Sequence, residues 1–164
     1  FTVLERDWQQ VDFVRRFGNP VFYSDAKRVE VLRAAHAGQA RLFVVAIADE
    51  DESVRVAETV RHNFPSLPIF AMAVTRRHAL KLMDLKITVI RRSLYSSLEM
   101  SRLLLTELGE DEASAARAIE LFRKHDEETL LKQHAVALDE EKVIQTAQEA
   151  AQELEALFES DKPS

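Results

Sequence analysis

Short apolar segments that alternate with helical segments constrain the fold of this chain more than any other feature. The five expected strands are residues 1–4, 21–23, 42–46, 69–72 and 87–89, and the four helices between them are residues 8–17, 27–35, 51–63 and 76–84. This alternation is typical of βαβ units, which build a parallel sheet with right-handed crossovers and helices on both faces. We therefore predict an α/β fold with a doubly wound parallel sheet. The continuous apolar run at 42–46 predicts a strand that is covered on both faces.

The pattern becomes purely helical after residue 92. We expect a helix at 93–108, one long or two shorter helices at 111–135, and a helix at 139–159. The last helix has apolar residues at 4-3-4-3 spacing, which indicates a coiled-coil seam of about two heptads. That seam could pack on a partner or on its own domain. We predict three regions: an α/β domain at 1–92, helices at 93–138, and an acidic helix and tail at 139–164.

Acidic residues follow the first two expected strands. Glu5 lies at the end of the first strand and Asp25 just beyond the second. Ligands bind outside the carboxyl ends of parallel strands, where a carboxylate can accept both ribose hydroxyls. The alternative is that Glu5, Asp7 and Asp25 only cap the helices that follow. Their spacing leaves both interpretations open.

The segment after the third expected strand offers a different kind of contact. Ala46, Ile47 and Ala48 would let a ligand lie against backbone groups at the end of the sheet. The four acids at 49–52 could approach a ligand at this end of the sheet. They also suit the start of the next helix, where the helix dipole favours negative charge, and we favour this capping role.

The three glycines, at positions 18, 38 and 109, cannot form the glycine-rich turn that holds a pyrophosphate. Two interpretations follow. The sheet is of another, flavodoxin-like kind, or the first strand and its turn precede Phe1. The chain begins within an expected strand, which favours a piece of a longer protein.

The composition excludes several classes of site. The chain has no cysteine, which excludes disulfides, thiolate metal sites and cysteine nucleophiles. None of its five histidines has a partner at metal-ligand spacing, so we predict neither a metal site nor a catalytic site. The net charge of -6 gives no basic footprint for nucleic acid. No apolar run approaches the roughly 20 residues of a membrane helix.

Two arginine pairs begin expected helices, Arg76-Arg77 and Arg91-Arg92. Such a pair could hold a carboxylate or phosphate through two parallel hydrogen bonds. We favour the alternative that the pairs lie on solvated helix faces.

Four segments together resemble one known family: FTVLERD, RRFGNPVFYSDAKRVEVLRAAHAGQARLFVVAIADEDES, VRHNFPSLPIFAMA and LLLTELG. The succession resembles the cytoplasmic RCK or KTN (TrkA-N) domain of the Kef family, the glutathione-gated potassium-efflux systems of bacteria. The resemblance implies a Rossmann-like sheet, with C-terminal helices, whose first strand and glycine-rich turn precede residue 1.

The resemblance also assigns a nucleotide site. Glu5 matches the acid that holds the adenosine ribose, and Asp25 with Ala26 matches the segment beside the adenine. Ala46, Ile47 and Ala48 match the loop that flanks the nucleotide. The implied ligand is AMP or NAD(H), with weak or absent binding where the phosphate-binding turn is missing. The implied domain is regulatory and not an enzyme.

The implied partners are a second copy of the domain and the transmembrane potassium/proton antiporter of the same polypeptide, at the cytoplasmic face of the bacterial inner membrane. Some family members add an ancillary quinone oxidoreductase. Met72 and Val74 stand where glutathione-gated members carry arginines, and Asp126 replaces an asparagine. These changes remove charge complementarity for an anionic tripeptide. The alternative functions are a fragment of a soluble NAD-dependent oxidoreductase and a pure dimerisation module.

Overall fold

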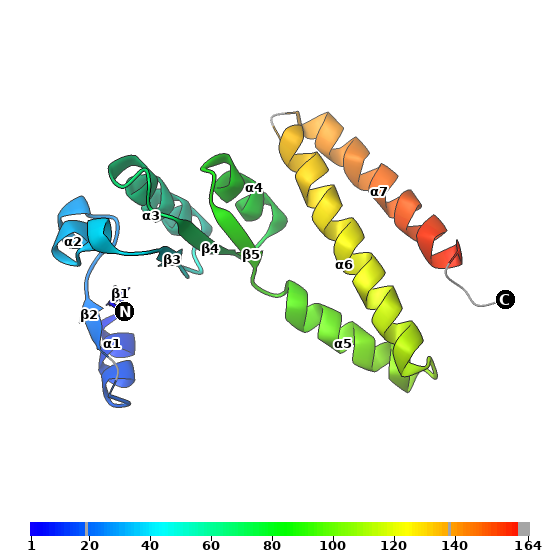
Figure 1. The fold of residues 1–164 in the computed structure, drawn as a ribbon, viewed down its shortest axis with the longest axis horizontal. Helices are drawn as coiled ribbons and strands as arrows, with labels where there is room; N and C mark the ends of the chain where they lie inside the picture. The colour runs from blue at the N-terminus through cyan, green and yellow to red at the C-terminus, as the bar shows by residue number, and fades with distance from the viewer. Residues whose placement is uncertain (19, 138, 161–164) are drawn as a thin grey trace. The chain divides into compact units, whose positions relative to one another are not determined.

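The computed structural model describes residues 1–18, 20–137 and 139–160 (Figure 1). The chain forms two compact units. The first comprises Phe1–Val74 and Lys81–Ile90, and the second comprises Thr75–Leu80 and the chain from Arg91 onward. The chain therefore passes between the units after Val74, after Leu80 and after Ile90.

Strands and helices alternate from Val3 to Arg91 as predicted. The elements in chain order are β1 (Val3–Glu5), α1 (Trp8–Arg15), β2 (Val21–Tyr23), α2 (Val29–Ala34), the short 3-10 helix η1 (Ala37–Gln39), β3 (Phe43–Val45), α3 (Glu50–Asn63), β4 (Ile69–Ala73), α4 (Arg76–Asp84) and β5 (Thr88–Arg91). This order and the parallel pairing of the strands confirm the α/β fold class.

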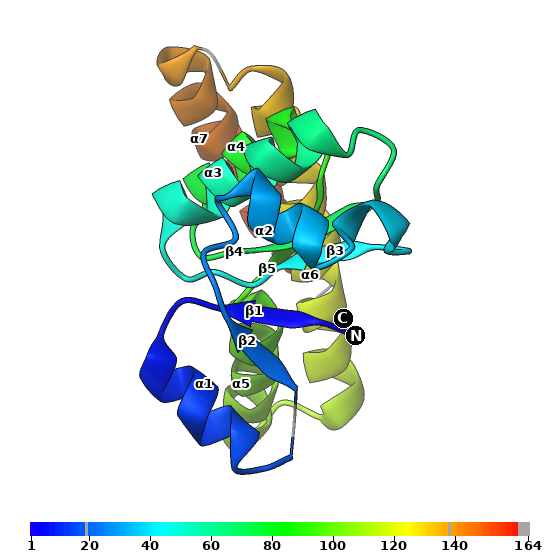
Figure 2. The same ribbon diagram turned by 90° about the vertical axis from the view of Figure 1, so that its left-hand side faces the viewer.

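The five strands lie in two sheets. β1 and β2 pair in parallel, with Val3 opposite Val21 and Glu5 opposite Tyr23, and Figure 2 shows the two strands side by side. The second sheet has the order β3-β4-β5, and β3 pairs in parallel with β4. Because the strands of each parallel pair run the same way, their carboxyl ends lie at the same edge.

The helices cover only one side of β3. Val45 is 1% exposed and belongs to a core with the apolar face of α3, including Val56, Ala57 and Val60. Val44, which points to the other face, is 57% exposed. The prediction that segment 42–46 is covered on both faces is therefore wrong within the described residues. The strand is apolar on both faces, but the described residues bury only one of them.

Local signals explain where the helices begin and end. The carboxylate of Asp7 accepts a hydrogen bond from the N–H of Gln9, and that of Asp49 accepts one from the N–H of Glu52, so both residues cap helices. Gly18 follows α1 with a φ of 78°, a backbone conformation that favours glycine. The next residue, Asn19, lies outside the described residues.

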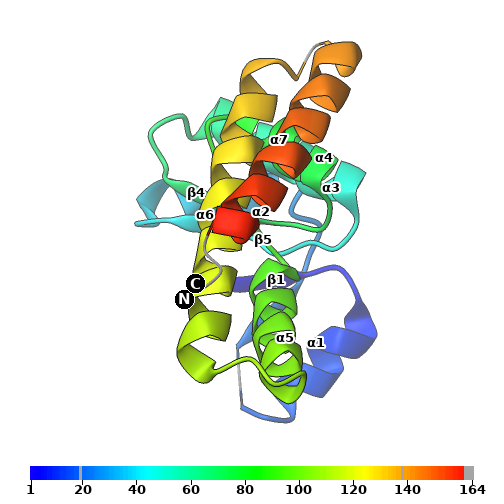
Figure 3. The same cartoon turned by 90° about the vertical axis from the view of Figure 1, so that its right-hand side faces the viewer.

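The second unit contains three further helices, α5 (Leu94–Glu107), α6 (Glu112–Ala135) and α7 (Glu140–Ser160). The segment 111–135 is thus one helix, and the carboxylate of Asp111 caps it. Figure 3 shows α6 and α7 side by side as a hairpin. The expected seam packs partly on its own chain, because Ala150 is buried whereas Ala147 and Leu157 are exposed. Residues 161–164 of the predicted tail lie outside the described residues, and the predicted region boundaries stay a prediction.

No helix in the described part of the chain combines the length and the apolar character needed to cross a membrane.

One arginine joins the end of α3 to the segments around β4 and β5. The guanidinium of Arg61 donates to the backbone oxygens of Pro65 at 3.0 Å, Leu67 at 3.3 Å, Leu85 at 3.0 Å and Lys86 at 2.9 Å. Lys86 has a positive φ of 56°, and the Arg61 contact holds its carbonyl in place. A planar group with several donors suits this set of carbonyls, whereas an ammonium group does not.

We expect Arg61→Lys to lower the free energy of unfolding by about 1–3 kcal/mol, because it keeps the charge but loses most of the carbonyl contacts. Urea unfolding measures this change. Arg55→Lys, at an exposed position of the same helix, is the matched control. Equal effects of the two substitutions would contradict the role of Arg61.

Candidate functional site

Parallel pairing brings the ends of β1 and β2 together. Glu5 is the last residue of β1, and the N–H of Ser24, just beyond β2, donates to the backbone oxygen of Glu5 at 2.8 Å. Asp25 follows directly. The structure thus places the two acids predicted from the sequence at one edge of the same two-stranded sheet.

The two acids accept hydrogen bonds from backbone N–H groups of their own loops and do not cap α1 or α2. Oε1 of Glu5 accepts hydrogen bonds from the N–H groups of Arg6 at 2.7 Å and Asp7 at 2.8 Å. Oδ1 of Asp25 accepts one from the N–H of Lys27 at 3.0 Å. The capping alternative therefore holds for Asp7, which caps α1, and for neither Glu5 nor Asp25. Both carboxylates are fixed in orientation at the carboxyl end of their strands.

A chain of ion pairs joins these loops to the start of α3. Oε1 of Glu52 lies 2.7 Å from a guanidinium nitrogen of Arg6 and 3.6 Å from Nζ of Lys27. Nζ of Lys27 also lies 3.5 Å from Oδ2 of Asp25. Since α3 follows β3, Glu52 connects the loops after three successive strands. Arg6 and Lys27 were not predicted from the sequence, and Glu52 was expected mainly to cap the helix. The available signal was a base within two residues of each acid.

The segment between β3 and α3 presents accessible backbone. Ala46 and Ala48 are exposed and Ile47 is partly buried, so the groups proposed to flank a ligand are reachable from solvent. Asp49 caps α3, as expected, through a 2.8 Å hydrogen bond from the N–H of Glu52. The same residue pair therefore orders the start of α3 and presents Glu52 to Arg6.

A second charged cluster lies within the second unit. Arg76 donates to Oδ1 of Asp126 at 3.0 Å and to its backbone oxygen at 3.1 Å, and Arg91 donates to Oδ2 of the same carboxylate. Burial, followed by repulsion from Arg76, lowers the pKa of the Arg91 guanidinium. The expectation of solvated helix faces is therefore wrong for Arg76 and Arg91. It agrees with the exposure of Arg77 and Arg92.

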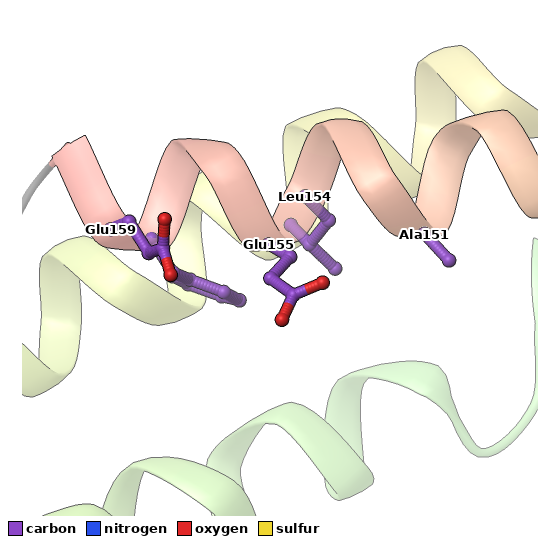
Figure 4. Close-up of a pocket in the computed structure, with 5 residues that line it drawn as sticks. Ala151, Leu154, Glu155 and Glu159 are labelled. Carbon is purple, nitrogen blue, oxygen red and sulfur yellow. The ribbon is translucent and has the colours of Figure 1, made fainter.

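A shallow hollow on α7 does not bring separate elements together. Its lining residues are Ala151, Leu154, Glu155, Phe158 and Glu159, and all lie on that one helix (Figure 4). The four that the figure labels project from the same side of α7. A surface formed by one helix lacks the convergent polar groups of a ligand site. Among the described residues, no group of three or more histidines and acids could hold a metal ion.

Comparison with known proteins identifies the family of this fold. Residues 1–92 match the TrkA-N domain, and residues 96–164 match the potassium efflux system KefB C-terminal domain. A solved structure described as "Shewanella denitrificans Kef CTD in AMP bound form" is 34% identical to this chain, with a TM-score of 0.73. The match covers 82% of this chain and 83% of the Shewanella chain.

These observations define a class of protein: an α/β domain with acids at the carboxyl ends of its parallel strands, followed by a helical unit. The chain belongs to the TrkA-N family, as a Kef-type RCK/KTN domain from a potassium efflux system.

We expect Glu52→Gln to speed amide hydrogen exchange in the loops at 6–7 and 24–27, because it removes the anion that holds Arg6 and Lys27. The effect on the free energy of unfolding should stay below about 1 kcal/mol, since Arg6 is largely exposed. High salt should reduce the difference. Glu58→Gln, at an exposed position of α3, is the control. Unchanged exchange in both loops would show that the ion pairs do not order them.

Proposed function

We propose that this chain is a regulatory domain that binds an adenine nucleotide at the carboxyl edge of β1, β2 and β3. The placement of Glu5 and Asp25 at the ends of two paired parallel strands, linked through Lys27 and Glu52 to the start of α3, carries this proposal. The AMP described for the Shewanella Kef domain supports the ligand class.

Each part of the site has a distinct role. Glu5 accepts hydrogen bonds from the ribose hydroxyls, since a carboxylate at this point of a dinucleotide-type sheet has the required geometry. Its two bonds from backbone N–H groups orient the carboxylate before the nucleotide arrives. Asp25 and Ala26 lie beside the adenine. The exposed backbone at Ala46, Ile47 and Ala48 flanks the nucleotide from the β3 side.

The phosphate-binding half of the site belongs between the two sheets. In a doubly wound sheet of order 3-2-1-4-5-6, the first strand separates the second from the fourth. Here β2-β1 and β3-β4-β5 are the two groups that would flank such a strand. We propose that a strand and glycine-rich turn preceding residue 1 fill this position. The exposure of the apolar Val44 side chain supports this proposal, because a further strand and its helix would bury that face of β3. AMP binding by residues 1–164 alone is accordingly weak or absent.

The domain's output is control of a transmembrane potassium/proton antiporter in the same polypeptide, at the cytoplasmic face of the inner membrane. The match of residues 96–164 to the KefB C-terminal domain supports this assignment. The nucleotide acts as a regulatory ligand, so the domain needs no catalytic group. An ancillary quinone oxidoreductase is a further partner that the family resemblance suggests.

We expect Glu5→Gln to weaken AMP binding to the intact domain, with its preceding strand and turn, by about tenfold to a hundredfold, because charged hydrogen bonds to ribose are lost. Asp25→Asn should weaken it less, since Asp25 lies beside the adenine and does not accept hydrogen bonds from the ribose hydroxyls. Isothermal titration calorimetry with AMP measures both. Glu30→Gln, at an exposed position of α2, is the control. Wild-type affinity in the Glu5 variant would contradict the ribose assignment.

A homodimer is the second part of the proposal, and α5 provides its surface. Met100, Leu103, Leu104 and Leu108 are each more than half exposed. The opposite side of the helix holds the buried Leu98. A helix that is apolar on both sides is typical of an element covered from both sides. We propose that a second copy of the chain covers the exposed stripe.

We expect Leu104→Glu to convert the dimer to monomers, because it places a charge in the centre of the apolar stripe. Sedimentation equilibrium measures the shift. Thr106→Glu adds the same charge at an exposed position on another side of α5 and should leave the dimer intact. A wild-type chain that is monomeric at high micromolar concentration would contradict the proposed dimer.

A further inference from the structure

Three charged side chains from distant parts of the sequence converge in the second unit. Arg76 is the first residue of α4, Arg91 the last residue of β5, and Asp126 lies in the middle of α6. The carboxylate of Asp126 accepts from both guanidiniums, one on each oxygen. The pairing spans 50 residues of sequence on the Arg76 side and 35 on the Arg91 side.

The carboxylate of this cluster is more buried than the carboxylates that pair with Arg102, Arg123 and Lys132 in the second unit. The side chains of Asp126 and Arg91 are 12% and 15% exposed, and that of Arg76 is 36% exposed. The pairs of Arg123 with Glu120 and Glu127, by contrast, lie along the surface of α6 itself. An ion pair within one helix adds little to tertiary structure, whereas a shielded one between elements fixes their contact.

The charges in the cluster do not balance. Two guanidiniums share one carboxylate, and the nearby Glu127 and Tyr95 favour the charged form of Arg91 only through longer-range interactions. Nε of Arg76 is buried and has no hydrogen-bond partner among the described residues. The two arginines therefore form a fork that needs an anion, and Asp126 is the anion that the chain itself provides.

We propose that Asp126 is a built-in carboxylate that closes the Arg76–Arg91 fork and latches α6 to the start of α4 and the end of β5. Both carboxylate oxygens are used, so a neutral amide at this position could satisfy only one arginine. Any external anion that reaches the fork must displace Asp126, and the displacement releases α6. Asp126 thus inhibits the binding of other anions to the two arginines. This inference does not depend on the proposed nucleotide site.

Hydrogen exchange followed by mass spectrometry on the full chain tests the latch. In Asp126→Asn we expect amides in 76–80 and 122–130 to exchange about tenfold faster or more, because two guanidiniums lose their anion. Arg91→Lys keeps the charge, loses the planar fork and should give a smaller increase. Glu120→Gln, which removes an exposed partner of Arg123 on the same helix, should change these rates less than twofold. Rates for Asp126→Asn within twofold of wild type would overturn the proposal.

Acetate tests whether the two arginines bind a carboxylate in general or only form a structural ion pair with Asp126. In Asp126→Ala, sodium acetate should restore protection relative to sodium chloride at equal ionic strength. It should do so neither in wild type, whose fork is closed, nor in the double variant Arg91→Gln with Asp126→Ala. Equal protection by the two salts in Asp126→Ala, or acetate protection of the wild type, would overturn the assignment of Asp126 as a closing group.

Discussion

Parallel strand pairing is the constraint on which the candidate nucleotide site of this domain depends. Strands that run the same way end at the same edge, so residues some 20 positions apart in sequence become neighbours. The register of β1 on β2 sets Glu5 opposite Tyr23 and brings Ser24 onto the Glu5 carbonyl. The loops at this edge then need little further support. Glu52 provides it by holding Arg6 and Lys27 through partly exposed ion pairs that are individually weak.

The two charged clusters of the chain perform different physical tasks. The cluster around Glu52 orders loops that remain open to solvent, as a site that admits a ligand requires. The cluster around Asp126 is shielded, has one more cation than anion, and joins helix to helix and strand. Removal of one partner from a shielded pair is far more destabilising than its loss from an exposed pair. The first cluster therefore suits ligand entry, and the second suits control over the position of α6.

Most of the fold could be predicted from periodicity and from helix termini. Asp49 and Gly18 mark a helix start and a helix end by mechanisms that are local in sequence. The exposure of Val44 could not be predicted, because the apolar pattern of a strand shows that it needs cover and not which residues provide it. The division of the strands into two sheets depends on hydrogen bonds between distant segments, and local patterns do not contain that information.

The candidate site could be predicted only in part for the same reason. Glu5 and Asp25 follow strands, so their position is predictable, whereas the partners of Arg6 and Lys27 depend on where α3 begins in space. Arg76 and Arg91 were expected on solvated helix faces, because their common partner lies on α6, far along the chain. Ion pairs between distant elements are a tertiary property, and charge alone does not reveal them.

Backbone NMR shifts of the intact domain during an AMP titration test the central claim most directly. A nucleotide at the carboxyl edge of β1, β2 and β3 should shift the amides of Arg6, Ala26 and Ile47 first, in proportion to occupancy. Saturable shifts confined to residues around Arg76, Arg91 and α6, with the β1 and β2 loops unchanged, would contradict it and place the nucleotide at the other charged cluster.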